Sequence, residues 1–329
     1  AFEGCSRLAL VVIPDSVVAI GNEAFSSFKI SSIKIPRSVT SFGGNPFALC
    51  KNLKVIDVSE NPNFVFDNGV LMNREMTRIV CCCPSKRGDY DIPNTVTTIC
   101  VGAFRECDEL NRISIPDSVT SIEDEAFLRC NNLCSITIPN SVVSIGSGAF
   151  QCCEQLSSIE VPNSVREIGG EAFACCHEME SITIPGSVEV LGANLFAGSC
   201  NLSEIRVVGE GGNIRMVDGV LFNGDMTRLI WCSKKKSGSY EIPPTVKTID
   251  SYVFYSCKEL ASVTIPDSIT EINHGVFHNC SGLETFKIPR LVTSIGENPF
   301  SSCTSLESVV IPDSVTSIGD WAFSYCEKI

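Results

Sequence analysis

A mainly β solenoid is the fold class that the sequence predicts, and two periodic features carry this prediction. An aliphatic residue followed by proline recurs along the chain, and the interval between successive prolines is 23 residues seven times, 22 once, and 57 and 58 in two longer units. A phenylalanine stands eleven residues after every one of these prolines. A fixed period of this length is typical of repeat architectures, in which each unit buries its apolar face against the next. The prolines are Pro14, Pro36, Pro93, Pro116, Pro139, Pro162, Pro185, Pro243, Pro266, Pro289 and Pro312.

Each unit is predicted to begin with a short β-strand. Residues 133–138 read Leu-x-x-Ile-x-Ile, whose final alternation of apolar and polar residues is typical of a half-buried strand. Proline ends the strand, and Asn140 followed by Ser141 then favours a turn. We interpret Ser118, Ser141 and Ser164, each two residues after a proline, as members of a structural column of hydroxyl groups. The strands of successive units are expected to stack in parallel.

A glycine-containing segment completes each unit. Seven repeats carry Gly seven residues after the proline, where we expect a positive φ. Asp250 and Asn273 fill this place in two others, and both residue types tolerate a left-handed backbone. The Ala-Phe pair that follows is expected to form a short helical turn, so the class is an α/β repeat that is mainly β. The phenylalanine column is expected to lie inside one continuous core. The glycines are Gly21, Gly43, Gly146, Gly169, Gly192, Gly296 and Gly319.

Composition and charge exclude several kinds of protein. Apolar residues make up 44% of the 329 residues and charged residues 19%, which suffices for a buried core. The longest uncharged apolar runs are shorter than the ~18 residues that a membrane span needs, so the sequence predicts no membrane insertion. The 38 Asp and Glu against 25 Lys and Arg give a net charge of −13, which repels nucleic acid.

Cysteine recurs fourteen residues after most of the prolines, and Phe28 takes its place once. A column in which Phe replaces Cys is apolar, so buried free thiols are favoured over disulfides. The cysteines lack the paired C-x-x-C spacing of a structural zinc site. His274 and His278 lie near Cys280, and we interpret them as surface histidines in preference to metal ligands. The column consists of Cys50, Cys107, Cys130, Cys153, Cys176, Cys257, Cys280, Cys303 and Cys326, with Cys200 one place late and Cys5 by extrapolation.

The repeat pattern C-x-x-L-x-x-I-x-I-P-x-S-V-x-x-I-G-x-x-A-F resembles the BspA-like class of leucine-rich repeats. Residues 138–150 and 311–323 show the pattern clearly, and the resemblance spans essentially the whole chain. It implies a leucine-rich-repeat solenoid with a parallel β-sheet on its concave face. The two longer units, about residues 57–92 and 207–242, resemble the hairpin-bearing repeats of that family.

The two longer units also carry a hairpin signal of their own. Asn223-Gly224 lies between two apolar runs, a dipeptide that favours a tight turn between strands. The first unit has Asn73 followed by Arg74, so its turn is expected to differ in type. Residues 1–329 are interpreted as a single solenoid. Because the chain begins at Ala1–Cys5 and ends just past Cys326, both in mid-repeat, we expect it to be a section of a longer array.

The resemblance implies a cell-surface or secreted protein that adheres to proteins or glycans of host cells, matrix or other microbes, with no catalytic residues and no cofactor. No nucleophile elbow, phosphate-binding loop or dinucleotide motif contradicts this non-enzymatic interpretation. Two alternatives remain: a structural spacer and, as a less favoured one, a carbohydrate-active or thiol-dependent enzyme. The candidate binding residues lie on the predicted concave strands or in a basic patch after the second hairpin, and they are Lys34, Arg112, Glu160, Glu241, Lys287, Lys234, Lys235 and Lys236.

Overall fold

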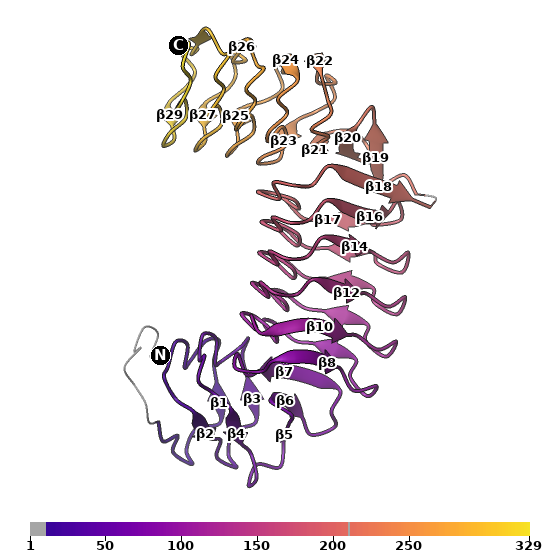
Figure 1. Ribbon diagram of the computed structural model, residues 1–329, viewed down its shortest axis with the longest axis vertical. Coiled ribbons are helices and arrows are strands. Elements are labelled where there is room, and N and C mark those ends of the chain that lie inside the picture. Colours follow the sequence, from indigo (N-terminus) through magenta and orange to yellow (C-terminus); the bar gives the residue numbers. More distant parts are fainter. Residues whose placement is uncertain (1–10, 210) are drawn as a thin grey trace.

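An ordinary unit forms one coil, and from Ser32 onward each such coil contains two short strands joined by turns. The computed structural model describes residues 11–209 and 211–329, and the mainly β solenoid is confirmed (Figure 1). We call the strand before a repeat proline, or the strand at the same place where a long unit begins, the leading strand, and the two-residue strand after the proline the trailing strand. The segment from the trailing strand to the cysteine column is called the closing turn. The truncated repeat Ala1–Cys5 lies outside the described residues.

Leading and trailing strands pair in parallel with their counterparts in neighbouring coils. The leading strands are β2 (Ser32–Lys34), β4 (Val55–Asp57), β8 (Gly88–Asp91), β10 (Leu110–Ser114), β12 (Ser135–Thr137), β14 (Ser158–Glu160), β16 (Ser181–Pro185), β18 (Glu204–Val208), β22 (Gly238–Glu241), β24 (Leu260–Thr264), β26 (Thr285–Lys287) and β28 (Val309–Val310). The trailing strands are β1 (Ala19–Ile20), β3 (Ser41–Phe42), β9 (Thr98–Ile99), β11 (Ser121–Ile122), β13 (Ser144–Ile145), β15 (Glu167–Ile168), β17 (Val190–Leu191), β23 (Thr248–Ile249), β25 (Glu271–Ile272), β27 (Ser294–Ile295) and β29 (Ser317–Ile318).

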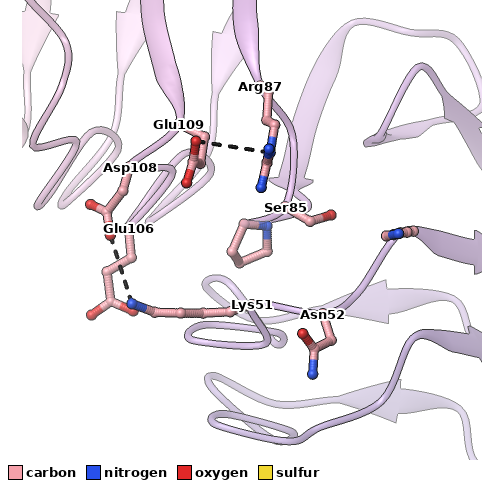
Figure 2. A pocket seen from close by; sticks show the side chains of 9 residues that line it. Lys51, Asn52, Ser85, Arg87, Glu106, Asp108 and Glu109 are labelled. Carbon is pink, nitrogen blue, oxygen red and sulfur yellow. Dashed lines mark ion pairs between the residues drawn. The ribbon is translucent and has the colours of Figure 1, made fainter.

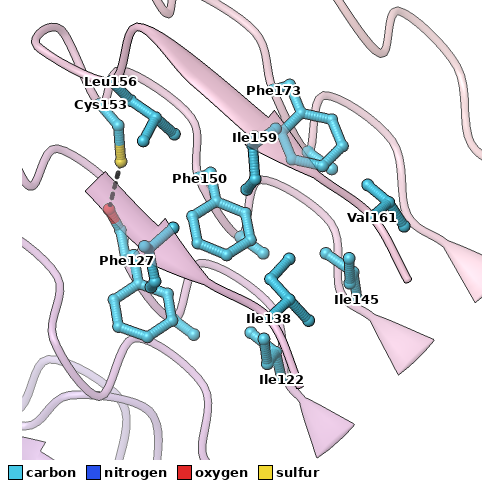
Figure 3. Packing of buried hydrophobic residues seen from close by; sticks show 14 of the residues in the cluster. Ile122, Phe127, Ile138, Ile145, Phe150, Cys153, Leu156, Ile159, Val161 and Phe173 are labelled. Carbon is cyan, nitrogen blue, oxygen red and sulfur yellow. Dashed lines mark hydrogen bonds between the residues drawn. The ribbon is translucent and has the colours of Figure 1, made fainter. Parts of the chain in front are cut away.

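Stacked phenylalanine rings form the centre of each coil stack, as predicted (Figure 3). The rings of Phe104, Phe127 and Phe150 lie 5.2 Å apart in succession, with interplanar angles of 6° and 8°. Phe150 and Phe173 follow at 5.7 Å and 4°. Phe150 is fully buried between its neighbours. Stacks of this kind add to the free energy gained by burying the apolar area of each ring.

Side-chain donors fasten each coil to the one before it. The Cys153 thiol donates to the backbone oxygen of Phe127 at 3.2 Å, and the same contact recurs along the cysteine column. Where Cys200 falls one place late, Ser199 donates to the Phe173 oxygen at 2.8 Å instead. All 18 described cysteines are free thiols, and Cys5 lies outside the described residues. The column is therefore a row of buried hydrogen-bond donors as well as small apolar groups.

The predicted hydroxyl column is present and has the same function. Ser118 Oγ donates to the backbone oxygen of Val96 at 2.7 Å, and Ser141 Oγ donates to that of Val119 at 2.6 Å. Each serine thus satisfies a carbonyl group in the preceding coil, next to the turn that the proline begins.

The recurrent glycine is required for a different reason from the one predicted. None of the seven glycines at this place has a positive φ. A Cβ at Gly169 would lie 2.3 Å from the Ser147 nitrogen, and one at Gly146 would lie 2.4 Å from the Asp124 nitrogen, so the glycine is needed because two backbones approach closely. Asp250 likewise has no positive φ, and it follows a long unit, where the neighbouring coil is built differently.

The closing turn contains no helical turn, which corrects the sequence expectation. It is a series of turns with two left-handed residues, nine and thirteen places after the proline. In one coil these are Glu125 and Arg129, with φ of 56° and 58°. Two reversals of φ within five residues interrupt the repeated right-handed dihedrals that a helix needs.

Each long unit replaces the trailing strand and closing turn of a coil with an antiparallel meander. The strands are β5 (Phe64–Asp67), β6 (Val70–Asn73) and β7 (Arg78–Cys82) in the first unit, and β19 (Ile214–Val217), β20 (Val220–Asn223) and β21 (Arg228–Cys232) in the second. In each long unit the first hairpin has a two-residue turn, Asn68-Gly69 in one unit and Asp218-Gly219 in the other. Both residues of each turn have positive φ, as a type I′ turn requires.

The second hairpin turn is largely alike in the two units, although a difference was expected. Asn73 Oδ1 accepts the Arg78 backbone N–H at 2.8 Å, and Asn223 Oδ1 accepts that of Arg228 at 2.8 Å. The positive φ falls on Met76 and on Met226, and not on Gly224. The asparagine contact and the place of the positive φ are therefore shared, and the turns differ in that Thr77 N–H donates to Asn73 Oδ1 whereas Thr227 N–H donates to Asp225 Oδ1.

The meanders divide the core, which is not the single continuous cluster that the repeat suggests. Leu71 packs into the N-terminal cluster, whereas Val70 and Met72 on the same strand β6 pack into the central one. Leu221 and Phe222 on β20 face the central and C-terminal clusters in the same way. Because a strand points alternate side chains to opposite faces, each meander separates two hydrophobic clusters and contributes side chains to both.

The solenoid bends at both long units, and the missing closing turn explains why. At the first unit the closing turns of the flanking coils touch directly, since a Cβ at Gly44 would lie 2.8 Å from Val101 Cγ1. The meander strands instead add to the sheet of trailing strands at the same level. A layer present on one side and absent on the other is a wedge, and Figure 1 shows both arms turned toward the same side of the molecule.

We expect Phe150→Ala to lower the free energy of unfolding by about 3–5 kcal/mol, because it empties a fully buried aromatic site between two stacked rings. Val143→Ala, at a side chain that is 49% exposed, is the control and should change it by less than about 0.5 kcal/mol. Urea denaturation followed by circular dichroism measures both values. Equal midpoints for the two variants would contradict an interior phenylalanine column.

Close backbone approach predicts opposite results for two glycines at the same place in the repeat. Gly169→Ala should destabilise the protein by about 1–3 kcal/mol, because its Cβ meets the backbone of the preceding coil. Gly21→Ala should be neutral or slightly stabilising, because no atom of residues 11–209 or 211–329 lies within 4 Å of the added Cβ. Thermal melts of the two variants test this, and similar losses at both positions would show that conformational freedom, not contact, selects glycine.

Candidate functional site

The leading strands present a polar face. The residues two and four places before the proline point outward, and most are exposed Ser, Thr or charged residues. Five of the predicted binding residues lie exposed on this face, one on each of β2, β10, β14, β22 and β26, and they are Lys34, Arg112, Glu160, Glu241 and Lys287.

Strand pairing places no two of these five residues directly opposite each other. Glu241 lies opposite Thr264, and Lys287 is on the next strand of the same sheet. Glu160 lies opposite Thr183, in a sheet that holds none of the other four residues. The five residues therefore do not form one site.

Acidic neighbours pair with two of the cations on this face. Arg112 Nε lies 3.3 Å from Asp89, and its Nη2 lies 3.3 Å from Asp91. Lys34 Nζ lies 2.8 Å from Glu60. Pairs this exposed contribute little to stability, so they mainly balance charge across the face.

The basic segments after the meanders hold the long units in place. Lys236 Nζ lies 4.5 Å from the centre of the Tyr240 ring and pairs with Asp218 at the hairpin turn. Lys86 lies over Tyr90 at 4.6 Å in the equivalent position of the first unit. A cation over an aromatic ring is stabilising, so these two lysines have structural partners.

The other two predicted lysines differ in exposure. Lys234 is partly buried, its Nζ lies 6.0 Å from the centre of the Tyr255 ring, and burial lowers its pKa. Lys235 is exposed, and with Lys236 it lines a recess of about 430 Å³ beside the hairpin turn. Within the predicted basic patch, Lys235 is therefore the side chain most available to a partner.

A recess at the first bend is the feature that sequence reasoning missed. It has a volume of about 620 Å³, within the usual range for ligand sites. Figure 2 shows that its walls come from the end of one closing turn, the connection between β7 and β8, and the end of the next closing turn. The lining residues are Lys51, Asn52, Lys54, Pro84, Ser85, Arg87, Glu106, Asp108 and Glu109. We call it the first-bend pocket.

The first-bend pocket is lined by charges of both signs. Lys51 Nζ lies 3.9 Å from Asp108, and Arg87 Nε lies 3.8 Å from Glu109 (Figure 2). Both pairs are loose and partly exposed, so their groups remain able to exchange partners. The sequence held one signal for this pocket, the basic residues that follow β7, but the missing closing turn that opens it is visible only in three dimensions.

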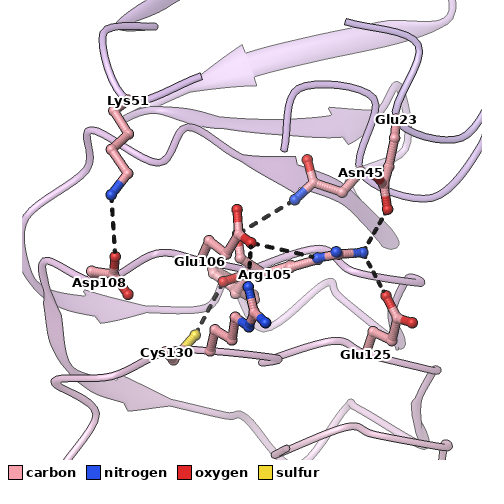
Figure 4. A network of polar contacts seen from close by, with 10 residues as sticks. Glu23, Asn45, Lys51, Arg105, Glu106, Asp108, Glu125 and Cys130 are labelled. Carbon is pink, nitrogen blue, oxygen red and sulfur yellow. Dashed lines mark hydrogen bonds and ion pairs between the residues drawn. The ribbon is translucent and has the colours of Figure 1, made fainter. Parts of the chain in front are cut away.

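A partly buried polar network lies behind the pocket (Figure 4). Arg105 Nη1 lies 2.6 Å from Glu23 and 2.8 Å from Glu125, which joins the first coil to coils beyond the bend. The Glu106 side chain is 5% exposed, and burial raises its pKa against the opposing effects of Arg105 and Arg129. Its Oε2 is buried without a hydrogen-bond partner, so this wall of the pocket holds an unsatisfied acceptor.

A tighter ion pair fixes the second bend. Arg228, at the start of β21, donates to both oxygens of Asp250 at 2.7 and 2.6 Å, and to the backbone oxygens of Leu191 and Gly192. Both side chains are largely buried. One guanidinium group thus ties the meander to the closing turns on either side of it.

The histidines do not converge on a metal site. His274 Nδ1 lies 3.9 Å from Glu297, whereas His278 stacks on Tyr255 at 5.3 Å and Cys280 donates inward to Phe254. Among the described residues, no three His, Cys, Asp or Glu side chains lie close enough to hold a metal ion.

Stacked parallel coils, a column of prolines and phenylalanines, and intervening meanders define a leucine-rich-repeat solenoid. The chain belongs to the BspA type of leucine-rich repeat proteins, because the model of that repeat region matches residues 1–87, 81–203 and 231–329, in six copies. A search of curated protein sequences finds no match to this chain.

Two solved structures show the same architecture. A leucine-rich cell surface protein from Faecalibacterium prausnitzii A2-165 is 29% identical, with a TM-score of 0.63 over 95% of this chain and 82% of that protein. The pneumococcal vaccine antigen PcpA is 22% identical, with a TM-score of 0.58 over 79% of this chain and 86% of that protein, and supports the fold alone. Residues 11–209 and 211–329 contain no helix long and apolar enough to cross a membrane.

Removing the cation at the second bend should cost more than removing its counterpart at the first. Arg228→Ala leaves Asp250 buried without its ion partner, and we expect a loss of about 3–5 kcal/mol. Arg78→Ala, at the same place in the first unit, loses an exposed pair with Glu123 and should cost about 1 kcal/mol or less. Urea denaturation compares the two, and equal losses would contradict the assigned difference between the bends.

Proposed function

We propose that this chain is a non-enzymatic recognition module of a cell-surface or secreted protein, and that it binds proteins or glycans of host cells, matrix or other microbes. Membership of the BspA type of leucine-rich repeats supports this proposal, as does the similar F. prausnitzii protein, which is described as a cell surface protein. Fold alone is weak evidence for function, so the case rests on the surface.

The first-bend pocket is the observation that carries the proposal. It combines three cations and three carboxylates with the neutral groups of Asn52 and Ser85, and only one apolar residue, Pro84, lines it. Groups of both signs suit a polar partner that offers hydrogen bonds and paired charges. The net charge of −13 argues against a nucleic acid.

The polar face of the leading strands supports a second, broader contact with the partner. Its outward residues are mostly small hydroxyl side chains with scattered charges, and they continue along the strands of each arm. Such a face offers many weak, repeated contacts and few anchoring groups. We propose that it adds multivalent contact to the more specific contact at the pocket.

Charge reversal in the pocket tests this function. Binding of the chain to a panel of immobilised matrix proteins and glycans is measured by biolayer interferometry. The variant Lys51→Glu/Lys54→Glu/Arg87→Glu should weaken binding to its best partner by about tenfold or more, which corresponds to about 1.4 kcal/mol. Reversal of Lys247, Arg290 and Lys328, which lie outside the pocket, is the matched control and should change affinity less than about twofold.

Two results would count against the proposal. Absence of binding to every member of the panel would favour a structural spacer. Equal weakening by the two triple variants would show that net charge, and not the first-bend pocket, determines attachment.

A further inference from the structure

A ridge of left-handed residues runs along the closing turns, and two consecutive coils carry cysteine on it. The ridge is formed by the residues thirteen places after each proline. Cys152 and Cys175 occupy it with φ of 57° and 55°, so their side chains leave the backbone in the same direction. Both are partly exposed, unlike their sequence neighbours Cys153 and Cys176 in the cysteine column.

The two thiols lie side by side. The Cys152 backbone N–H donates to the Ala174 oxygen at 2.8 Å, so the coils are in hydrogen-bonded register at this point. Coils in such register are about 4.7–4.9 Å apart, and a disulfide usually spans Cα atoms 4.4–6.8 Å apart. The side chains of Cys152 and Cys175 are near enough for each to shift the pKa of the other.

Neighbouring groups favour a thiolate at one of the two positions. The hydrogen bond from Cys175, with the charge and hydrogen bond of Arg129, lowers the pKa of Cys152 to about 6 against burial and the carboxylate of Glu154. Arg129 is itself held 3.7 Å from Glu106. The same hydrogen bond and burial raise the pKa of Cys175. These shifts favour a thiolate at Cys152 and a protonated thiol at Cys175.

The next residues in sequence provide a contrast within the same coils. Cys153 and Cys176 are also 23 residues apart, but both are fully buried. Each donates its thiol to a backbone oxygen, that of Phe127 or of Phe150, and burial raises both pKa values, that of Cys176 to about 12. Equal spacing therefore does not by itself create a reactive pair.

We propose that Cys152 and Cys175 are a redox modification site, at which hydrogen peroxide converts two neighbouring thiols into a disulfide between adjacent coils. The Cys152 thiolate attacks one peroxide oxygen, so that an S–O bond forms, the O–O bond breaks and hydroxide leaves. Cys175 then attacks the Cys152 sulfur through its own sulfur; the S–S bond forms, the S–O bond breaks, and the Cys175 proton leaves with hydroxide as water. Two thiols and one peroxide give one disulfide and two waters.

Thiol mapping of the intact chain tests the site. The native protein is treated with equimolar peroxide, then denatured and alkylated, and its peptides are identified by mass spectrometry. We expect Cys152 and Cys175 to escape alkylation as a joined peptide pair two hydrogens lighter than the reduced peptides, whereas Cys153 and Cys176 are alkylated. The rate of this oxidation should hold between pH 8 and 7 and fall below pH about 6, as the Cys152 thiolate is protonated.

Two serine variants make the test specific. Cys175→Ser should abolish the cross-link and leave a sulfenic acid at Cys152 that dimedone traps, and serine occupies this place in another coil as Ser256. Cys153→Ser/Cys176→Ser should keep the cross-link, because Ser199 shows that serine makes the buried contact. Full alkylation of Cys152 after peroxide, a cross-link to Cys200, or a cross-link that the control variant loses would overturn the proposal.

Discussion

Contact between adjacent coils at hydrogen-bonding distance is the constraint on which the rest of this structure depends. A carbonyl oxygen of one coil accepts from a thiol, a hydroxyl or a backbone N–H of the next, as at Phe127, Val119 and Ile145. The phenylalanine rings then stack at 5.1–5.7 Å through most of the array. Spacing this short leaves no room for a Cβ at Gly169. The recurrent residues of the repeat are therefore all selected by the short separation between adjacent coils.

Features that every repeat shares could be predicted from the sequence. Features that arise where a long unit interrupts the repeat could not. The strands, the buried Phe150 and the donor at Ser141 follow from local pattern, because every coil repeats them. The reason for Gly169 could not be predicted, since it depends on a backbone 22 residues away in sequence. The first-bend pocket was missed because it arises from a closing turn that one unit lacks, and an absent segment has no residues to recognise.

Buried charged groups also occur mainly where a long unit interrupts the repeat. Arg105, Glu106 and Arg228 all lie beside a long unit, where a coil lacks its ordinary neighbour and polar groups fill the place of stacked backbone. Cys152 and Cys175 sit instead in the regular central stack. There the repeat itself supplies the proximity, and only the side chain at one variable place differs from coil to coil.

The two corners have a geometric consequence. Because each corner is set by one omitted closing turn, its angle is independent of how many ordinary coils precede or follow it. Every 23-residue coil added to or removed from the straight segment would then move the corners apart or together by about 4.8 Å and leave both angles unchanged. The number of coils in the central segment therefore sets the distance between the two arms, and this distance can change during evolution in steps of one coil.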